Sequence, residues 1–133
     1  MAFTHVLTHS VNVGGTVITT SNSYSTDGRT SLVITLPANT PDYLVNVQID
    51  VTQIKSLYML ETGNNDRIGI YTNQLILPDD TIYVYDGIPI VWWTPNCLLT
   101  CPFTVDVTKI YLGNFSVTLA ATFKLEIIHD ATP

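Results

Sequence analysis

Apolar and polar residues alternate with a period of two along most of this chain. The clearest run is residues 43–52, in which apolar side chains occupy the odd-numbered positions and mostly polar side chains occupy the even-numbered ones. The apolar positions are Tyr43, Val45, Val47, Ile49 and Val51. Successive side chains of a strand point to opposite faces, so this pattern predicts a half-buried strand. No stretch shows a sustained apolar period of about 3.6 residues, and the pattern therefore predicts an all-β chain.

Similar short runs recur along the chain, with turn residues about every 8–12 positions. The runs that predict strands are residues 3–13, 16–20, 31–36, 43–52, 57–60, 67–72, 81–93, 103–107, 109–112 and 117–129. Gly14-Gly15 predicts a hairpin between the first two runs, and the polar residues 21–30 predict a loop or a small exposed hairpin. Together these features predict an antiparallel β-sandwich, jelly-roll-like, of about nine or ten short strands in a single domain, residues 1–133.

Asp86-Gly87 lies between two β-rich halves of residues 81–93 and predicts a hairpin there. Both residues tolerate positive φ, as a two-residue type I′ turn requires, so Tyr85 would pair with Ile88. Alternation then gives this hairpin two apolar faces. One face carries Ile82, Val84, Pro89, Val91 and Trp93, and the other carries Tyr83, Tyr85, Ile88, Ile90 and Trp92. A small domain covers one face with its core, so the second face is the predicted contact surface for another chain.

Composition and charge narrow the possible partners. Charged residues make up 12% of the chain, about half of the usual share, and the net charge is −6. The few Lys and Arg residues are spread singly, without the basic stripe that phosphate binding needs, so nucleic acid is not an expected partner. No apolar run approaches the roughly 20 residues of a membrane span, and the first residues lack the features of a secretion signal. We therefore expect a protein made in the cytoplasm, without a membrane partner.

The histidines and cysteines do not predict a metal or a cofactor. His5 and His9 are four positions apart, but on a strand they would lie roughly 13 Å from each other, too far to share a metal. Cys97 and Cys101 do not have the spacing of a redox motif, and a zinc site needs more ligands. These two cysteines predict either a pair of buried thiols, which a cytoplasmic origin favours, or a disulfide within their loop.

The acidic residues predict turns rather than a calcium site or a catalytic site. Asp79-Asp80, Asp86 and residues 61–66 lack the ligand spacing of a calcium loop, whereas Asp and Asn favour turns. No nucleophile, metalloprotease or phosphate-loop motif occurs, so no enzyme activity is expected. Asn114-Phe115-Ser116 matches a glycosylation acceptor and is interpreted as a turn.

Aromatic residues provide a second kind of candidate site. The members of a possible sugar-stacking platform are Tyr71, Tyr83, Tyr85, Trp92 and Trp93. Core packing explains most of them. Where Tyr83 and Trp92 lie on an outer face, they equally anchor a protein interface, because Tyr and Trp are enriched at such interfaces.

Five segments of the chain resemble small all-β virion proteins of tailed bacteriophages that decorate or cement capsids. They are SVNVGG (residues 10–15), DVTQIKSLY (50–58), PDDTI (78–82) leading to Pro89 and Trp92, DVTKIY (106–111) and EIIHD (126–130). The resemblance implies a jelly-roll-like fold, no enzyme activity, and many copies fixed to a capsid lattice, often as trimers. It implies the major capsid protein and copies of the same chain as partners, and the capsid surface of the virion as the location.

The leading expectation is therefore a non-enzymatic capsid decoration or cement protein. Two alternatives stay open. One is a carbohydrate- or receptor-binding β-sandwich module, and the other is a minor tail or connector component of the same particle.

Overall fold

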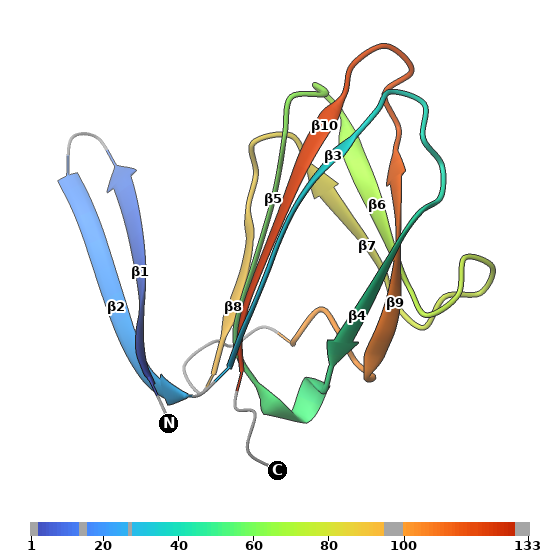
Figure 1. The fold of residues 1–133 in the computed structure, drawn as a ribbon. Helices are drawn as coiled ribbons and strands as arrows, with labels where there is room; N and C mark the ends of the chain where they lie inside the picture. The colour runs from blue at the N-terminus through green and yellow to red at the C-terminus, as the bar shows by residue number, and fades with distance from the viewer. Residues whose placement is uncertain (1–2, 14–15, 27, 95–99, 130–133) are drawn as a thin grey trace.

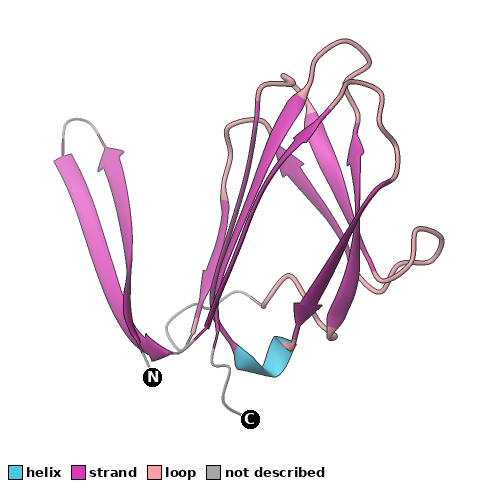
Figure 2. Cartoon of the chain, in the orientation of Figure 1, coloured by secondary structure: helices cyan, strands magenta, loops and turns pink. Residues whose placement is uncertain are grey.

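The computed structural model describes residues 3–13, 16–26, 28–94 and 100–129, with side chains described from residue 28 onward. Within these ranges the chain forms ten strands and one short 3₁₀ helix, as Figure 2 shows. Their bounds are β1 (Phe3–Val13), β2 (Thr16–Thr26), β3 (Gly28–Leu36), β4 (Tyr43–Ile49), η1 (Val51–Gln53), β5 (Ile54–Thr62), β6 (Arg67–Thr72), β7 (Thr81–Tyr85), β8 (Ile90–Trp93), β9 (Val107–Asn114) and β10 (Ala121–His129). The all-β prediction is confirmed.

Strands β3 to β10 form two antiparallel sheets that pack face to face, in the orders β3-β10-β5-β8 and β4-β9-β6-β7 (Figure 1). Four nested pairs are hydrogen-bonded: β3 with β10, β4 with β9, β5 with β8, and β6 with β7. The eight strands are thus one long hairpin that turns at residues 73–80. Rolling this hairpin up brings β10 beside β5 and β6 beside β9. This is the topology of a jelly roll, and it confirms the predicted sandwich.

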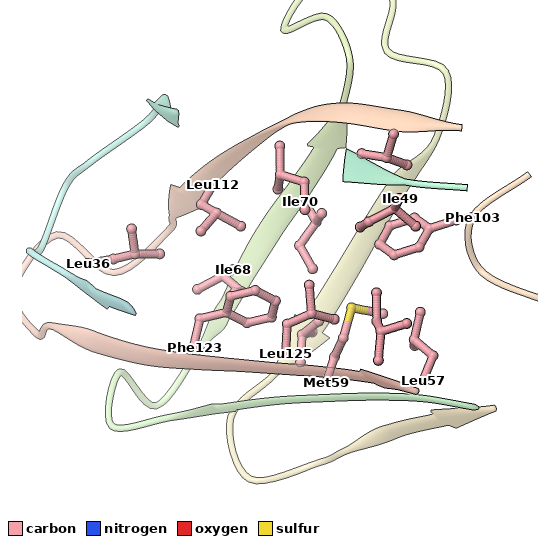
Figure 3. Packing of buried hydrophobic residues seen from close by; sticks show 14 of the residues in the cluster. Leu36, Ile49, Leu57, Met59, Ile68, Ile70, Phe103, Leu112, Phe123 and Leu125 are labelled. Carbon is pink, nitrogen blue, oxygen red and sulfur yellow. The ribbon is translucent and has the colours of Figure 1, made fainter. Parts of the chain in front are cut away.

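Alternation along the strands builds the core between the two sheets. In β10, Ala121, Phe123, Leu125 and Ile127 are buried, whereas the residues between them are more exposed. Figure 3 shows that side chains of this sheet meet those of the other sheet, which contributes Ile68, Ile70 and Leu112. Phe103 reaches the same core from the loop before β9.

The hairpin predicted over residues 81–93 is wrong, because its two halves belong to different sheets. β7 pairs with β6, whereas β8 pairs with β5. Asp86-Gly87 does form a turn, in which the Ile88 N–H donates to the Tyr85 carbonyl over 3.0 Å. Only Gly87 has a positive φ in this turn, which is the pattern of a type II turn rather than the type I′ turn of a two-residue hairpin. The chain therefore crosses from one sheet to the other at this point.

Hydrogen bonds from distant segments fix this crossing. The Asp86 N–H donates to the Asp66 carbonyl, and the Gly87 N–H donates to the Glu61 carbonyl, each over 2.8 Å. The segment after β7 is therefore held against the end of β5, from which β8 continues as the next strand of that sheet.

Some predicted boundaries also differ from the structure. The hairpin of β1 and β2 is confirmed, with Phe3 opposite Thr26 and Val13 opposite Thr16, although Gly14-Gly15 lies outside the described residues. β2 runs on through residues 21–26, which were predicted as part of a loop or a small exposed hairpin. The predicted strand at 103–107 is wrong, because strand structure begins only at Val107, and residues 117–120 precede β10 rather than belong to it.

Candidate functional site

The outer face of the β4-β9-β6-β7 sheet carries a group of aromatic side chains. Because Ile68 and Ile70 point into the core, the alternating positions of β6 (Arg67, Gly69 and Tyr71) lie on the outer face. The same argument holds for β7, where buried Val84 places Tyr83 and Tyr85 outward. The register sets Arg67 opposite Tyr85 and Gly69 opposite Tyr83.

Arg67 lies at the centre of this group, and its guanidinium contacts three rings. The guanidinium carbon is 4.7 Å from the ring centroid of Phe115, 5.1 Å from that of Tyr83 and 6.0 Å from that of Tyr85. The Tyr83 and Phe115 rings also contact each other, with centroids 6.0 Å apart. Arginine is attracted to aromatic faces, so the four side chains hold one another in place. We call Arg67, Tyr71, Tyr83, Tyr85 and Phe115 the aromatic surface.

Two glycines provide the floor of the aromatic surface. Gly69 of β6 and Gly113 of β9 are directly opposite each other in the sheet. A Cβ atom on Gly69 would lie 2.5 Å from the Tyr71 hydroxyl oxygen and 2.8 Å from its ring, so the Tyr71 side chain lies directly over this glycine. A glycine within a strand is costly unless something must approach the backbone closely. Here the Tyr71 side chain makes that approach.

The aromatic surface is partly open to solvent. Tyr83 and Tyr85 are 43% and 49% exposed, whereas Tyr71 is half-buried. Burial, followed by interactions with Tyr83, raises the pKa of the Tyr71 hydroxyl, so it stays a neutral hydrogen-bonding group at physiological pH. Beside Tyr71 and Phe115 is a hollow of about 270 Å³, which Asn39, Pro41, Gly113 and Asn114 also line.

The structure divides the predicted contact surface. Tyr83 and Tyr85 lie together on the aromatic surface, and Ile88 is exposed in the crossing that follows β7. Ile90 and Trp92 belong to β8 in the other sheet, where both are partly buried against the core. The five residues therefore do not form one continuous face, because they do not share one hairpin.

The predicted sugar-stacking platform is divided in the same way. Tyr71, Tyr83 and Tyr85 come together, whereas Trp92 and Trp93 lie on β8. Two members of the aromatic surface were missed. The alternation of residues 67–72 places Arg67 on the face of Tyr71, which is a signal that the sequence contains. No local pattern predicts the position of Phe115, because only the rolling of the hairpin brings the end of β9 beside β6.

Two of the acidic residues predicted to lie in turns, Asp80 and Asp86, hold loops in place. An Asp86 side-chain oxygen accepts from the Gly63 N–H over 2.7 Å, and the Asp80 side chain accepts from the Thr104 N–H and hydroxyl. Asn114 of the glycosylation pattern is buried, and its side-chain nitrogen donates to the carbonyls of Leu36, Pro37 and Leu119. Asn114 is thus a loop-organising residue in the interior.

The thiols and histidines are only partly within the described side chains. Cys101 has a free, half-buried thiol whose pKa is raised by burial. The His129 ring contacts the Thr30 hydroxyl at 3.3 Å. Cys97 and the side chains of His5 and His9 lie outside the described part of the structure. Among the side chains that are described, no group of three or more His, Cys, Asp or Glu residues is placed to hold a metal ion.

Glu61 is a buried acid that the sequence reasoning assigned to a turn. Its side chain is 0% exposed, and among the described residues neither carboxyl oxygen has a hydrogen-bond partner. The pKa of Glu61 is raised to about 7, mainly by burial and also by the negative charges of Asp86 and Asp66, and the nearby Asn64 N–H offsets only part of this shift. Leu57, Met59 and Glu61 share one parity, so continuing the alternation of β5 would have placed this side chain inside.

Comparison with protein-family models, with curated proteins and with solved structures gives no match for this chain. In the described ranges, no helix has the length and hydropathy needed to cross a membrane. Functional inference for this protein therefore depends on the aromatic surface and on the fold that presents it.

Proposed function

We propose that this chain is a non-enzymatic structural protein that binds another protein through the aromatic surface. The observation that carries the proposal is the composition of this surface, in which tyrosine and phenylalanine rings surround a single arginine. Residues of these types are enriched in the centres of protein–protein interfaces, where a few of them provide most of the binding energy. Lys, Asp and Glu, which such centres avoid, are not among its five members.

Contacts within the chain restrain the side chains of the aromatic surface. Tyrosine rings lose little conformational entropy on binding, and here the stacked Arg67 guanidinium restrains them further. The Arg67 Nε–H is buried and has no hydrogen-bond acceptor within the described structure. A buried donor without an acceptor costs about 1–3 kcal/mol.

The proposed setting is the outer capsid surface of a tailed-phage virion, with the major capsid protein as the partner. The sequence segments that resemble decoration proteins support this setting. The jelly-roll topology is compatible with it, since that architecture recurs in viral capsid proteins and also in lectins. No step of the proposal requires a metal or a cofactor.

The test has two steps. Mass spectrometry of purified virus particles first shows whether they contain the chain, and rebinding of the purified protein to those particles is then measured. We expect Tyr85→Ala to weaken rebinding about tenfold or more, because truncation of a tyrosine that dominates an interface costs about 2 kcal/mol or more. Tyr43→Ala is the matched control, since Tyr43 is similarly exposed on β4, outside the aromatic surface. Absence of the chain from particles contradicts the capsid setting, and full rebinding by Tyr85→Ala contradicts the role of the aromatic surface.

The hollow beside Tyr71 favours a second candidate function, carbohydrate binding. The Tyr71 and Phe115 rings border it, and the polar side chain of Asn39 lies at its edge. A sugar needs this combination of an apolar ring surface and hydrogen-bonding groups. Glycan-array binding that Tyr71→Ala abolishes would support this function. Tryptophan fluorescence is a poor reporter here, because Trp92 and Trp93 lie on β8 in the other sheet.

A further inference from the structure

Strands β1 and β2 form a two-stranded ribbon that joins neither sheet of the sandwich. They pair with each other along their whole length, and Figure 1 shows the ribbon standing beside the sandwich. A two-stranded ribbon is marginally stable at best in water, and it needs a third strand or an apolar surface to pack against. No other described strand of the chain pairs with it. The described part of the chain therefore does not supply a third strand for the ribbon.

The ribbon is amphipathic and carries no acidic or basic residue other than histidine. Residues 3–26 contain no Asp, Glu, Lys or Arg, in a chain whose net charge is −6. The register sets Val11 opposite Ile18 and His5 opposite Tyr24 on one face. The alternate pairs are mostly polar, as in Thr8 opposite Ser21. Copies of an acidic protein repel one another, and this segment is the one in which such repulsion is weakest.

The sandwich has four edge strands, and three of them are protected against pairing with other chains. β8 is four residues long and follows Pro89. β7 is five residues long and lies between Asp80 and Asp86. β4 follows Pro41-Asp42, and its pairing is irregular after Asn46. Short length, flanking prolines, nearby charges and irregular pairing are the usual means of blocking an edge.

The fourth edge strand, β3, is the least protected, because Asp27 and Pro37 lie only at its two ends and the strand between them is long and regular. It is nine residues long, contains neither Pro nor Lys, and pairs with β10 in an unbroken register. Its one charged residue, Arg29, is neutralised by Glu126 of β10 over 2.9 Å. Val33, on its outward face, is 66% exposed. Such an edge is a template for an additional strand.

We propose that the ribbon of one copy pairs with the free edge of β3 in a second copy. Each element has what the other lacks, since the ribbon needs a third strand and β3 has an open side. β2 and β3 are separated by one residue yet belong to different sheets, so the ribbon leaves the end of β3 instead of lying along it. Reciprocal exchange between two copies gives a dimer, and head-to-tail exchange gives a closed ring such as a trimer.

The proposal goes beyond the proposed function, because it uses a different surface and a second copy of the chain as the partner. Either proposal can therefore fail alone. Sedimentation equilibrium of the whole chain over a range of protein concentrations tests the pairing of the ribbon with β3. We expect the average mass to rise with concentration from that of a monomer to that of a defined oligomer. Val33→Lys should raise the dissociation constant by about tenfold or more, because a charged side chain now lies on the pairing edge.

Two further variants sharpen this test. Thr35→Lys, at the next outward position of β3, should weaken association like Val33→Lys. Val117→Lys is the control, since Val117 is 74% exposed in the loop before β10 and lies off this edge, so its oligomer should be unchanged. Hydrogen exchange supplies a second readout. The β1 amides should be protected at high concentration and should lose protection on dilution and in Val33→Lys.

Three results would overturn the proposal. The first is a wild-type chain that stays monomeric with unprotected β1 amides at every concentration. The second is β1 protection that does not depend on concentration, which would mean that the ribbon packs on its own chain. The third is an oligomer whose mass and affinity are the same in wild type and in both lysine variants of β3.

Discussion

Leu77 occupies a backbone conformation that suits its residue type poorly. Its φ is +58°, in the left-handed region, and its side chain is 84% exposed. A residue with a Cβ pays about 1 kcal/mol or more for this conformation, and here little burial compensates. The strain persists because neighbouring residues fix the loop: the Asn73 side-chain nitrogen donates to Asp79 and to the Asp106 carbonyl.

We expect Leu77→Gly to raise the free energy of unfolding by up to about 1 kcal/mol, because glycine adopts positive φ without strain. Urea denaturation measures the change. Ile76→Gly is the matched control, since Ile76 is 80% exposed in the same loop and has no positive φ. The control should lose about 0.5–1 kcal/mol through added chain entropy. Equal loss of stability in both variants would show that the backbone of Leu77 is not strained.

Asn114 shows how one residue joins several elements. Its side-chain nitrogen donates to carbonyls at the end of β3 and in the loop before β10, and its side-chain oxygen accepts from Asn64, in the loop after β5, over 2.9 Å. The Ser116 N–H donates to the same oxygen over 3.0 Å. Three loops at one end of the sandwich are therefore held together by the single buried side-chain amide of Asn114.

We expect Asn114→Ala to lower the free energy of unfolding by about 3 kcal/mol, because several buried partners lose their hydrogen bonds at once. Thermal and urea denaturation measure the loss. Asn46→Ala, at an exposed position of β4, should change stability by less than about 0.5 kcal/mol. A loss at Asn114 no greater than at Asn46 would mean that water replaces the amide without cost.

At the scale of elements, alternation predicted most strands but not how they pair. The strand β4, residues 67–72 and the inward face of β10 followed from a period of two, because burial of one face requires it. The strand predicted over residues 43–52 is too long, since β4 ends at Ile49 and η1 follows. Asp86-Gly87 looked like a local hairpin, but hydrogen bonds to Asp66 and Glu61 made it a crossing between sheets. Those partners are 20 and 26 residues away along the chain, so a turn motif contains no information about them.

The same distinction explains which parts of the aromatic surface were predictable. Tyr83 and Tyr85 are outward because their parity opposes that of Val84, and this can be read from a few adjacent residues. Their contact with Phe115 requires β9 to lie beside β6, which is a property of the rolled hairpin as a whole. Sequence patterns thus indicate which way a side chain points, while topology decides its neighbours.

At the scale of the whole molecule, Glu61 links the stability of the sandwich to pH. Its carboxyl group is buried at the end of β5, and its backbone carbonyl accepts from Gly87 in the crossing between the sheets. Its pKa is about 7 in the folded state, whereas the ordinary value of a glutamate, which applies to the unfolded chain, is 4.5. The folded chain therefore binds this proton more tightly than the unfolded chain does. Its contribution is complete below pH 4.5 and is lost as the pH rises through about 7.

We expect the free energy of unfolding to fall by roughly 3 kcal/mol between about pH 4.5 and pH 7 and then to level off. Glu61→Gln keeps the shape without the charge, so this decline should disappear and the variant should exceed wild type at neutral pH. Asp50 cannot mimic the effect, because its hydrogen bonds to Thr52 lower its pKa and its influence lies at more acidic pH.

Glu126→Gln is the control for this measurement, since Glu126 is a carboxylate with its own partners, Arg29 and Ser31, on the surface of β10. Urea denaturation at a series of pH values should show the decline in this control as in wild type. A decline that survives in Glu61→Gln would mean that another group causes it. A wild-type profile that is flat between about pH 4.5 and 7 would mean that water reaches the carboxyl group. In that case the crossing beside Glu61 would open locally while the two sheets stay folded. Ionisation of Glu61 would then no longer lower the free energy of unfolding of the whole sandwich.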